Sequence, residues 1–211
     1  MKKIGFIGCG NMGGALARAA IKSVGAENIF VFDVDTKKIR DFADETDVNV
    51  SDAEYIVLNC DYIFLGVKPQ MLKTLFEKVA PIIEDRTTDF ILVSMAAGVS
   101  MESIAEMAQV DCPIIRIMPN MPVSVGEGMV LYTSNEFVSK EDLDGFIDAM
   151  KYAGRLGKIE EEKIDAASCV SGCGPAFVFM FCEALADGAV ECGLLRVVHI
   201  HRQQDRVTCR G

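Results

Sequence analysis

Apolar residues in the first 158 positions gather in short runs that are separated by amphipathic stretches. Short runs rich in Ile, Val, Leu and Phe are typical of strands that are buried on both faces of a parallel sheet. The predicted strands are residues 4–7, 29–34, 62–67, 90–95, 114–118, 128–132 and 156–159.

Stretches with helical periodicity separate these strands. An Ala-rich helix follows the first strand and extends to Val24, and later helices are predicted over residues 37–46, 69–84, 101–108 and 139–152. Ser100 and Ser139 are suited to cap two of these helices. The alternation of strand and helix predicts an α/β fold, with a doubly wound and mostly parallel sheet of Rossmann type over residues 1–158.

From residue 159 the pattern becomes helical. A helix is predicted over residues 160–167, Ser171–Pro175 interrupts it, and a longer helix covers residues 176–192. The longer helix is apolar nearly all round, so we expect it to be buried against another element or another subunit. Residues 159–195 are therefore predicted to begin a second, all-helical domain.

Charge and hydropathy indicate which kinds of partner and which cellular location are expected for this protein. The net charge of −10 argues against a nucleic acid or an anionic membrane as partner. No uninterrupted apolar run reaches the roughly 18 residues of a transmembrane helix. The start MKKIGFIG resembles the charged end of a signal peptide, but glycines interrupt it and it forms the first strand. We expect a cytoplasmic protein.

The eight cysteines are scattered, and none forms a C-x-x-C pair. Cys169 and Cys173 are four apart with no histidine nearby, which favours neither zinc nor a redox pair. We interpret the cysteines as small buried apolar residues in a reducing compartment, and we predict no metal site.

The glycine-rich turn after the first strand carries the strongest functional signal. Gly8, Gly10 and Gly13 form G-x-G-x-x-G between a strand and a helix, the context in which this pattern binds dinucleotides. Gly8 allows the tight turn, Gly10 lets a pyrophosphate approach the backbone, and Gly13 lets the helix pack closely. A glycine turn without a ligand is the alternative, and the context favours a dinucleotide site.

The end of the second strand bears on the choice of dinucleotide. Asp33 lies 20 residues after Gly13, where an acid usually binds the adenine ribose of NAD. Asp35, Thr36, Lys37 and Lys38 follow, and a hydroxyl, two ammonium groups and free helix N–H groups are suited to a 2′-phosphate. A simple helix cap with solvated lysines explains the same residues. These residues leave NAD and NADP open.

Two further strands end in small or special residues. Gly66–Pro69 and Ala96–Gly98 follow their strands directly, and open α/β sheets bind ligands at the carboxyl ends of strands. Small residues let a cofactor approach the backbone there, although ordinary turns are built from the same residues.

Taken with the glycine turn, three segments resemble the pyrroline-5-carboxylate reductase family, the last enzymes of proline biosynthesis. They are GVKP at residues 66–69, RIMPNMP at 116–122 and SGCGPA at 171–176. SMAAGV at residues 94–99 adds to the likeness, which spans about residues 1–195. The resemblance implies that the second domain is a dimerisation domain and that a hydride passes from NAD(P)H, usually NADPH, to the C=N bond of a small imine, giving proline.

The resemblance also implies roles for individual residues. The pyrophosphate is expected at Ile7, Gly8, Cys9, Gly10, Asn11 and Met12, and the adenosine ribose near Asp35. Val67, Lys68, Pro69, Ala96 and Ala97 are expected to line the cofactor. Substrate-side candidates are Glu161, Asn120, Ser171 and Cys173, and no residue is assigned as the catalytic acid. The family implies a homodimer or a higher homo-oligomer.

This chain departs from the family pattern in two places. Cys173 and Phe177 stand where the family usually has Ser and Tyr, which weakens polar contacts near the imine. Residues 196–211 carry +3 whereas residues 1–195 carry −13, and they do not resemble the family's further helices or its second substrate loop. We interpret them as an atypical basic tail on a truncated C-terminus, and we favour this over a metal site at His199 and His201.

Two other functions fit parts of the sequence. A related imine or β-hydroxyacid-type reductase shares the fold, but β-hydroxyacid enzymes generally need a lysine in the helical part, and none follows Lys163. A nucleotide-binding protein without turnover is the other reading, because truncation removes family elements that complete the substrate pocket. Cofactor binding without reduction would identify that second case.

Overall fold

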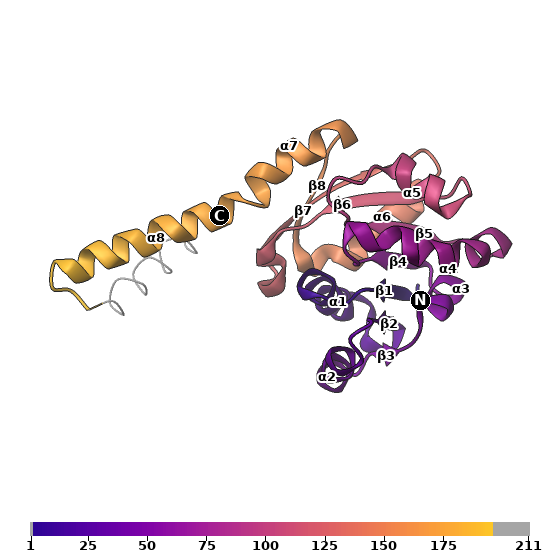
Figure 1. Cartoon of the computed structure of the whole chain (residues 1–211), viewed down its shortest axis with the longest axis horizontal. Helices are drawn as coiled ribbons and strands as arrows, with labels where there is room; N and C mark the ends of the chain where they lie inside the picture. The colour runs from indigo at the N-terminus through magenta and orange to yellow at the C-terminus, as the bar shows by residue number, and fades with distance from the viewer. Residues whose placement is uncertain (1, 196–211) are drawn as a thin grey trace. The chain divides into compact units, whose positions relative to one another are not determined.

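A computed structural model describes residues 2–195, and its larger part is a sheet covered by helices on both faces (Figure 1). The eight strands lie in the order β3-β2-β1-β4-β5-β6-β7-β8, with β6 and β7 antiparallel and the other neighbours parallel. The strands are β1 (Ile4–Ile7), β2 (Ile29–Phe32), β3 (Asn49–Val50), β4 (Tyr62–Leu65), β5 (Ile91–Ser94), β6 (Ile114–Met118), β7 (Gly128–Ser134) and β8 (Gly154–Lys158). The α-helices are α1 (Asn11–Val24), α2 (Thr36–Thr46), α3 (Ala53–Asn59), α4 (Leu72–Asp85), α5 (Met101–Ala108), α6 (Lys140–Met150), α7 (Glu161–Ser171) and α8 (Gly174–Glu191). The predicted doubly wound, mostly parallel sheet is confirmed.

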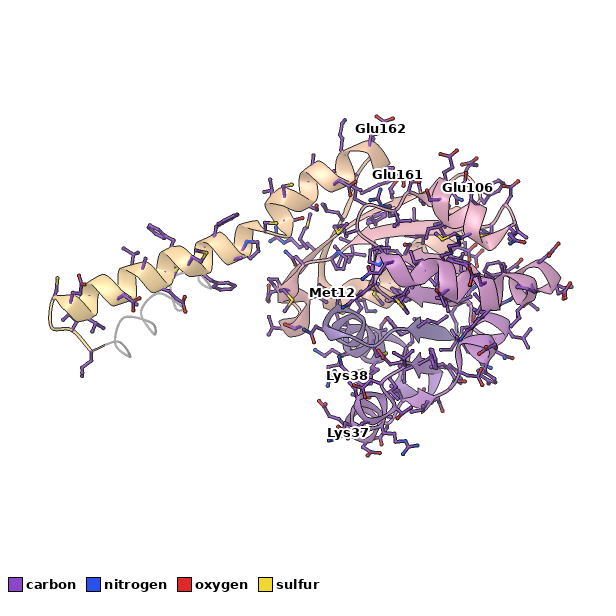
Figure 2. The ribbon with its side chains drawn as sticks, in the orientation of Figure 1. Met12, Lys37, Lys38, Glu106, Glu161 and Glu162 are labelled. Atoms are coloured by element: carbon purple, nitrogen blue, oxygen red, sulfur yellow. The ribbon has the colours of Figure 1, made fainter. Side chains whose placement is uncertain are left out.

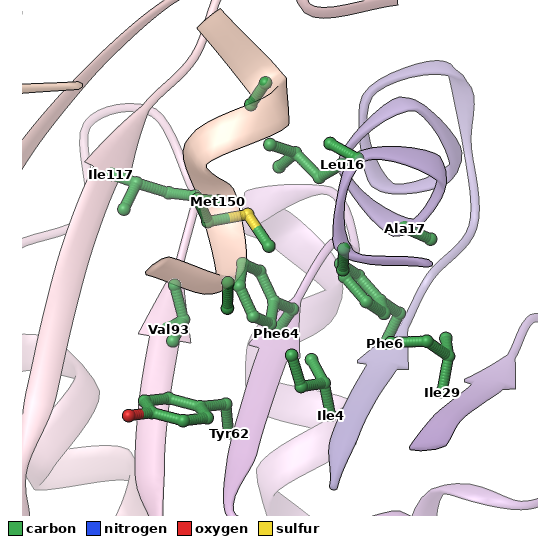
Figure 3. Packing of buried hydrophobic residues seen from close by; sticks show 14 of the residues in the cluster. Ile4, Phe6, Leu16, Ala17, Ile29, Tyr62, Phe64, Val93, Ile117 and Met150 are labelled. Atoms are coloured by element: carbon green, nitrogen blue, oxygen red, sulfur yellow. The ribbon is translucent and has the colours of Figure 1, made fainter. Parts of the chain in front are cut away.

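The central strands are apolar throughout because both of their faces are covered. In β1, Ile4 and Phe6 belong to the core under α1, α2 and α6, whereas Ile7 belongs to the core under α3, α4 and α5. Figure 3 shows the first of these cores, where Phe6 stacks on Phe64 with ring centroids 4.5 Å apart. Period-two side-chain alternation thus produces two apolar faces, and each face needs its own layer of helices.

The same topology gathers four strand ends at one edge of the sheet. Gly8, Asp33, Gly66 and Met95 directly follow β1, β2, β4 and β5, which run parallel to one another. The strand order reverses direction at β1, where open α/β sheets leave a crevice for ligands.

The ends of several predicted elements differ from the observed ones: the strand predicted over residues 62–67 is Tyr62–Leu65, and the one predicted over residues 156–159 is Gly154–Lys158. The second strand ends at Phe32 rather than residue 34, because the Asp33 carboxylate accepts backbone N–H groups and turns the chain. Val34 is consequently 82% exposed. The short elements β3 and α3 were not predicted, since a two-residue strand and a seven-residue helix carry almost no periodic signal.

The chain divides into two compact units, and the second begins at Cys169. The predicted domain border after residue 158 lies before α7, whereas this division lies within α7. The predicted basic tail at residues 196–211, with both histidines, lies outside the described residues.

In the second unit, α8 carries a large set of uncovered apolar side chains. Phe177, Phe179 and Phe181 are each about two-thirds exposed, and Ala186 is the buried residue of this helix. By length and composition alone, Glu161–Glu191 passes a test for a membrane-spanning helix, with a mean hydropathy of 1.6. Polar and charged residues interrupt the apolar runs of this stretch, which is why no transmembrane helix was predicted. Core or interface helices of soluble proteins can have the same length and composition.

Candidate dinucleotide site

Gly8, Gly13 and Gly66 allow the turn after β1 to lie in close backbone contact with the start of α1 and the end of β4. Gly8 has a φ of +98°, and a Cβ on it would lie 2.6 Å from the carbonyl carbon of Gly66. A Cβ on Gly13 or on Gly66 would lie 2.2 or 2.3 Å from the Gly8 carbonyl oxygen. Backbone hydrogen bonds hold the same segments together, since Gly8 N–H donates to the Phe32 carbonyl oxygen and Gly66 N–H donates to that of Ile7. These three positions therefore exclude any side chain on packing grounds alone.

Gly10 differs from these three glycines. A Cβ on Gly10 would meet no atom within 4 Å, so packing within the protein does not require glycine there. Gly10 is the N-cap of α1 and offers no side chain to the free N–H groups of its first turn. Open space, free N–H groups and the positive end of the helix dipole together fit a phosphate of a dinucleotide.

Asp33 makes two backbone contacts that its spacing did not predict, and its role at the adenine ribose stays a prediction. One carboxylate oxygen accepts from Cys9 N–H at 2.8 Å, and the other accepts from Asp35 N–H at 3.0 Å. The side chain thus joins the glycine turn to the start of the next loop. Asp35 in turn caps α2 by accepting from Lys38 N–H at 3.0 Å.

A pocket of about 500 Å³ lies beside the glycine turn and the start of α2. Its lining includes Gly10, Asn11, Arg18 and Lys38, together with Ser124 from the loop after β6. Arg18 pairs with Glu45 and stacks on the Phe42 ring at 4.5 Å, so its cation is already engaged. Lys37 and Lys38 are exposed at the start of α2 (Figure 2) and form no ion pair in the described part of the chain.

The residues predicted to line the cofactor at the neighbouring strand ends differ in exposure, and their role stays a prediction. Lys68, Pro69 and Ala97 are exposed, whereas Val67 is half-buried and Ala96 is buried. The buried Ser94 hydroxyl accepts from Ala96 N–H at 3.4 Å and helps to shape the turn. These segments share one edge of the sheet with the glycine turn because β1, β4 and β5 are parallel neighbours.

The Cys9 thiol lies inside the glycine turn and is 2% exposed. Burial, followed by the charge of Asp33, raises the pKa of Cys9 to about 12. The thiol therefore stays neutral at physiological pH and is no acid–base catalyst there. The expectation that cysteines are buried is confirmed for Cys9, Cys60 and Cys112, but it is wrong for the exposed Cys169, Cys173 and Cys192 of the second unit.

The substrate-side candidates separate into two groups. Asn120 is buried, and its side-chain oxygen accepts from Met129 N–H at 2.8 Å. Glu161 accepts from Met101 N–H at 2.8 Å and pairs with Arg116 at 3.3 Å. Ser171 and Cys173 lie in the second unit, at the end of α7 and the N-cap of α8. Their role as substrate contacts stays a prediction.

Arg116 is a residue whose partners sequence reasoning missed. It is 4% exposed in the middle of β6, and it pairs with Glu161 and with Asp165, the latter at 2.8 Å. The sequence did contain a signal, because an arginine inside the apolar run IIRIM is expected to be buried and to need acidic partners. The partners themselves were not visible, since they lie 45 and 49 residues away.

Comparison with known families matches both parts of the chain. Residues 3–98 match the family described as "NADP oxidoreductase coenzyme F420-dependent". Residues 161–199 match the family described as "Pyrroline-5-carboxylate reductase dimerisation".

Individual relatives extend this similarity over most of the chain. Pyrroline-5-carboxylate reductase of Escherichia coli (strain K12) is 39% identical over 199 residues, covering 92% of this chain and 72% of the relative. The crystal structure of Plasmodium falciparum pyrroline carboxylate reductase with NADP bound has a TM-score of 0.85 at 31% identity, covering 98% of this chain and 76% of that one. The Coxiella burnetii pyrroline-5-carboxylate reductase structure has a TM-score of 0.89 at 29% identity, with coverages of 98% and 77%.

Proposed function

The chain belongs to the pyrroline-5-carboxylate reductase family, and we propose that its Gly8–Gly13 turn binds the pyrophosphate of the nicotinamide cofactor. Its function is the reduction of Δ1-pyrroline-5-carboxylate to proline with NAD(P)H, the last step of proline biosynthesis. The observation that carries the site is Gly10, the one glycine of the turn that has open space beside it and free helix N–H groups behind it.

The residues of the site bind and orient rather than transfer protons. The bound cofactor supplies the hydride that reduces the C=N carbon. Asp33 holds the glycine turn by its bond to Cys9 N–H, so the phosphate-binding N–H groups are fixed before the cofactor arrives. At the adjacent strand ends, Lys68, Pro69 and Ala97 are exposed beside the half-buried Val67. An imine nitrogen is itself basic, so positioning accounts for much of the catalysis.

The decisive experiment mixes the purified chain with NADPH and Δ1-pyrroline-5-carboxylate. We expect NADPH absorbance to fall and an equimolar amount of proline to form. A parallel assay with NADH measures the cofactor preference. A chain that binds NADPH in a fluorescence titration but forms no proline would contradict the function and would select a non-catalytic nucleotide-binding protein.

We propose that NADPH is preferred, with Lys37 and Lys38 beside its 2′-phosphate. Both oxygens of Asp33 already accept backbone N–H groups, which disfavours Asp33 as the acceptor of a ribose hydroxyl. Replacing both lysines, Lys37→Gln with Lys38→Gln, is expected to raise the KM for NADPH about 10-fold and to leave that for NADH unchanged. Lys22→Gln is the matched control, because Lys22 lies in the last turn of α1 and the glycine turn lies at the start of that helix. Equal rises in both KM values would overturn this assignment.

The match to a dimerisation family indicates a homo-oligomer, and we propose a homodimer in which a second chain covers the apolar side chains of α8. Because a second chain would cover these apolar side chains, α8 would need no membrane around it, which favours a cytoplasmic enzyme over a membrane-anchored one. Light scattering of the detergent-free protein should give twice the chain mass. Phe181→Glu should shift this toward the monomer, whereas Lys73→Glu on α4 adds a carboxylate elsewhere and should not. A monomeric parent would contradict the proposal.

A further inference from the structure

Arg116, which is itself buried, joins the sheet to α7 through two ion pairs. Its Nη1 lies 3.3 Å from Glu161 Oε1, and its Nη2 lies 2.8 Å from Asp165 Oδ1. Glu161 and Asp165 are four residues apart, so one guanidinium holds two successive turns of the same helix face. Ile164 is the buried residue of α7, and the ion pairs of Glu161 and Asp165 add polar contacts at the start of this helix.

The same cluster also reaches the start of α5. Glu161 Oε1, the oxygen that faces Arg116, accepts from Met101 N–H at 2.8 Å. Met101 is the first residue of α5 and follows the Ala96–Gly98 turn closely in the chain. Arg116 itself lies beside Ser94 in the sheet register, directly before that turn. The cluster therefore links β6, α5 and α7 next to a segment that the proposed function assigns to the cofactor.

A gain in folding stability does not by itself explain why a buried arginine stands at position 116. The Nε atom of Arg116 is buried and has no hydrogen-bond partner in the described residues. A buried unmet donor is unfavourable, and buried ion pairs often contribute no more than apolar residues of similar volume. Methionine would fill the same space without these penalties, but it would leave the direction of α7 undefined.

We propose that Arg116 is a positioning residue for the reduction, and the proposal rests on the proposed function. It fixes the first turns of α7, the helix that leads into the Ser171–Ala176 segment, and through Glu161 it fixes the start of α5 after the Ala96–Ala97 turn. The fork of the guanidinium suits this task because it holds two carboxylates at once in a fixed geometry, whereas an ammonium group does not.

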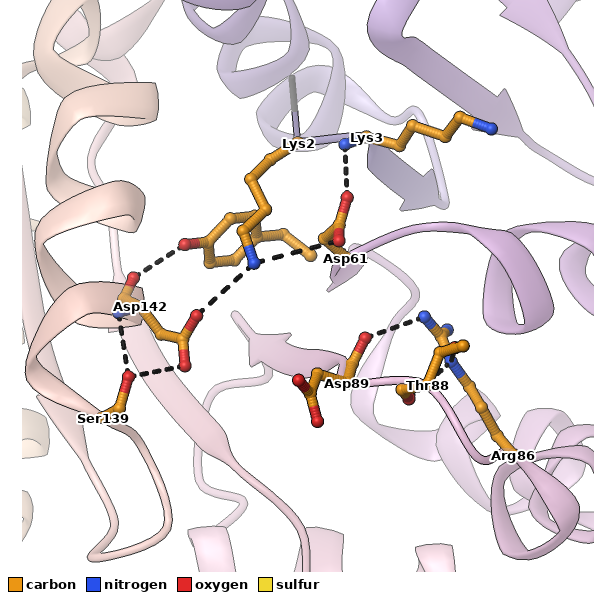
Figure 4. A network of polar contacts seen from close by, with 9 residues as sticks. Lys2, Lys3, Asp61, Arg86, Thr88, Asp89, Ser139 and Asp142 are labelled. Carbon is orange, nitrogen blue, oxygen red and sulfur yellow. Dashed lines mark hydrogen bonds and ion pairs between the residues drawn. The ribbon is translucent and has the colours of Figure 1, made fainter.

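Arg116→Met tests this proposal when it is compared with Arg86→Met. Arg86 is the matched control, a half-buried arginine at the C-cap of α4 that donates to the carbonyl oxygens of Thr88 and Asp89 (Figure 4) and to that of Val57. Arg86→Met should lower Tm by about 10 °C, because three carbonyl oxygens lose their donor, whereas Arg116→Met should lower Tm less. Arg116→Met alone should lower kcat about 20-fold while the Kd for NADPH changes less than about 3-fold. Amide exchange across residues 161–168 should rise about 10-fold.

Two conservative variants keep the test decisive if Arg116→Met does not fold. Arg116→Lys retains the buried charge and should recover part of kcat, and Asp165→Asn changes a side chain that is 61% exposed and should lower kcat about 5-fold with little loss of Tm. If the Arg116 variants lose Tm as Arg86→Met does but keep kcat within about 3-fold, Arg116 is merely structural and the proposal is overturned. An inactive parent protein that still binds NADPH would instead contradict the proposed function.

Discussion

Gly10→Ala is expected to fold like the parent protein and to bind NADPH about 30-fold more weakly, a loss of about 2 kcal/mol. The added methyl group meets no protein atom within 4 Å, and the backbone at Gly10, with φ −61°, is open to alanine. The same methyl group would occupy the space through which the pyrophosphate approaches the first turn of α1.

Fluorescence titration with NADPH measures this loss, and urea unfolding of the same preparation measures stability. We expect the free energy of unfolding to stay within about 0.5 kcal/mol of the parent value. A variant that binds NADPH as tightly as the parent would show that the phosphates lie elsewhere and would remove the main support for the site.

Gly13→Ala is expected to have the opposite profile and to destabilise the N-terminal unit by about 3 kcal/mol or more. Its Cβ would lie 2.2 Å from the carbonyl oxygen of Gly8, which is a backbone atom in a turn that Gly66 holds from the other side. The clash is relieved only if α1 moves away from β1, and that movement opens the core around Leu16 and Phe6.

Gly14→Ala is the control for this prediction, because it adds a methyl group at the next position of α1. Its nearest neighbour would be the Phe42 ring at 3.4 Å, an ordinary contact. We therefore expect Gly14→Ala to leave stability unchanged or to raise it by about 0.5 kcal/mol through helix propensity. Equal midpoints of urea unfolding for the two variants would refute the close contact between the glycines.

The order of the main strands and helices was predictable from residue type and spacing. Strands such as Tyr62–Leu65 are buried on both faces, so an unbroken apolar run identifies them. The caps at Ser100 and Ser139 were predictable for a similar reason, since each hydroxyl accepts from an N–H group only three residues away. In contrast, β3 and α3 escaped prediction because pairing with β2 and packing in the core define them, rather than a periodic pattern of their own.

The contacts of Asp33 illustrate what spacing alone does not predict. The count of residues from Gly13 placed an acid at the end of β2 correctly. The count carries no information on where the carboxylate points, and the structure directs both oxygens to backbone N–H groups. The residue supports the glycine turn through Cys9 N–H, and its contact with the adenine ribose stays a prediction.

The sequence by itself determined the doubly wound fold, the glycine turn and the family, because these depend on residue types within a few positions of one another. Only the tertiary structure decided which groups meet across the chain: Cys9 with Asp33 over 24 residues, and Arg116 with Glu161 and Asp165 over 45 and 49. It also separated Gly10, which has open space, from Gly8 and Gly13, which do not. These contacts depend on the direction of side chains and on the close approach of distant backbones, and no local pattern encodes either.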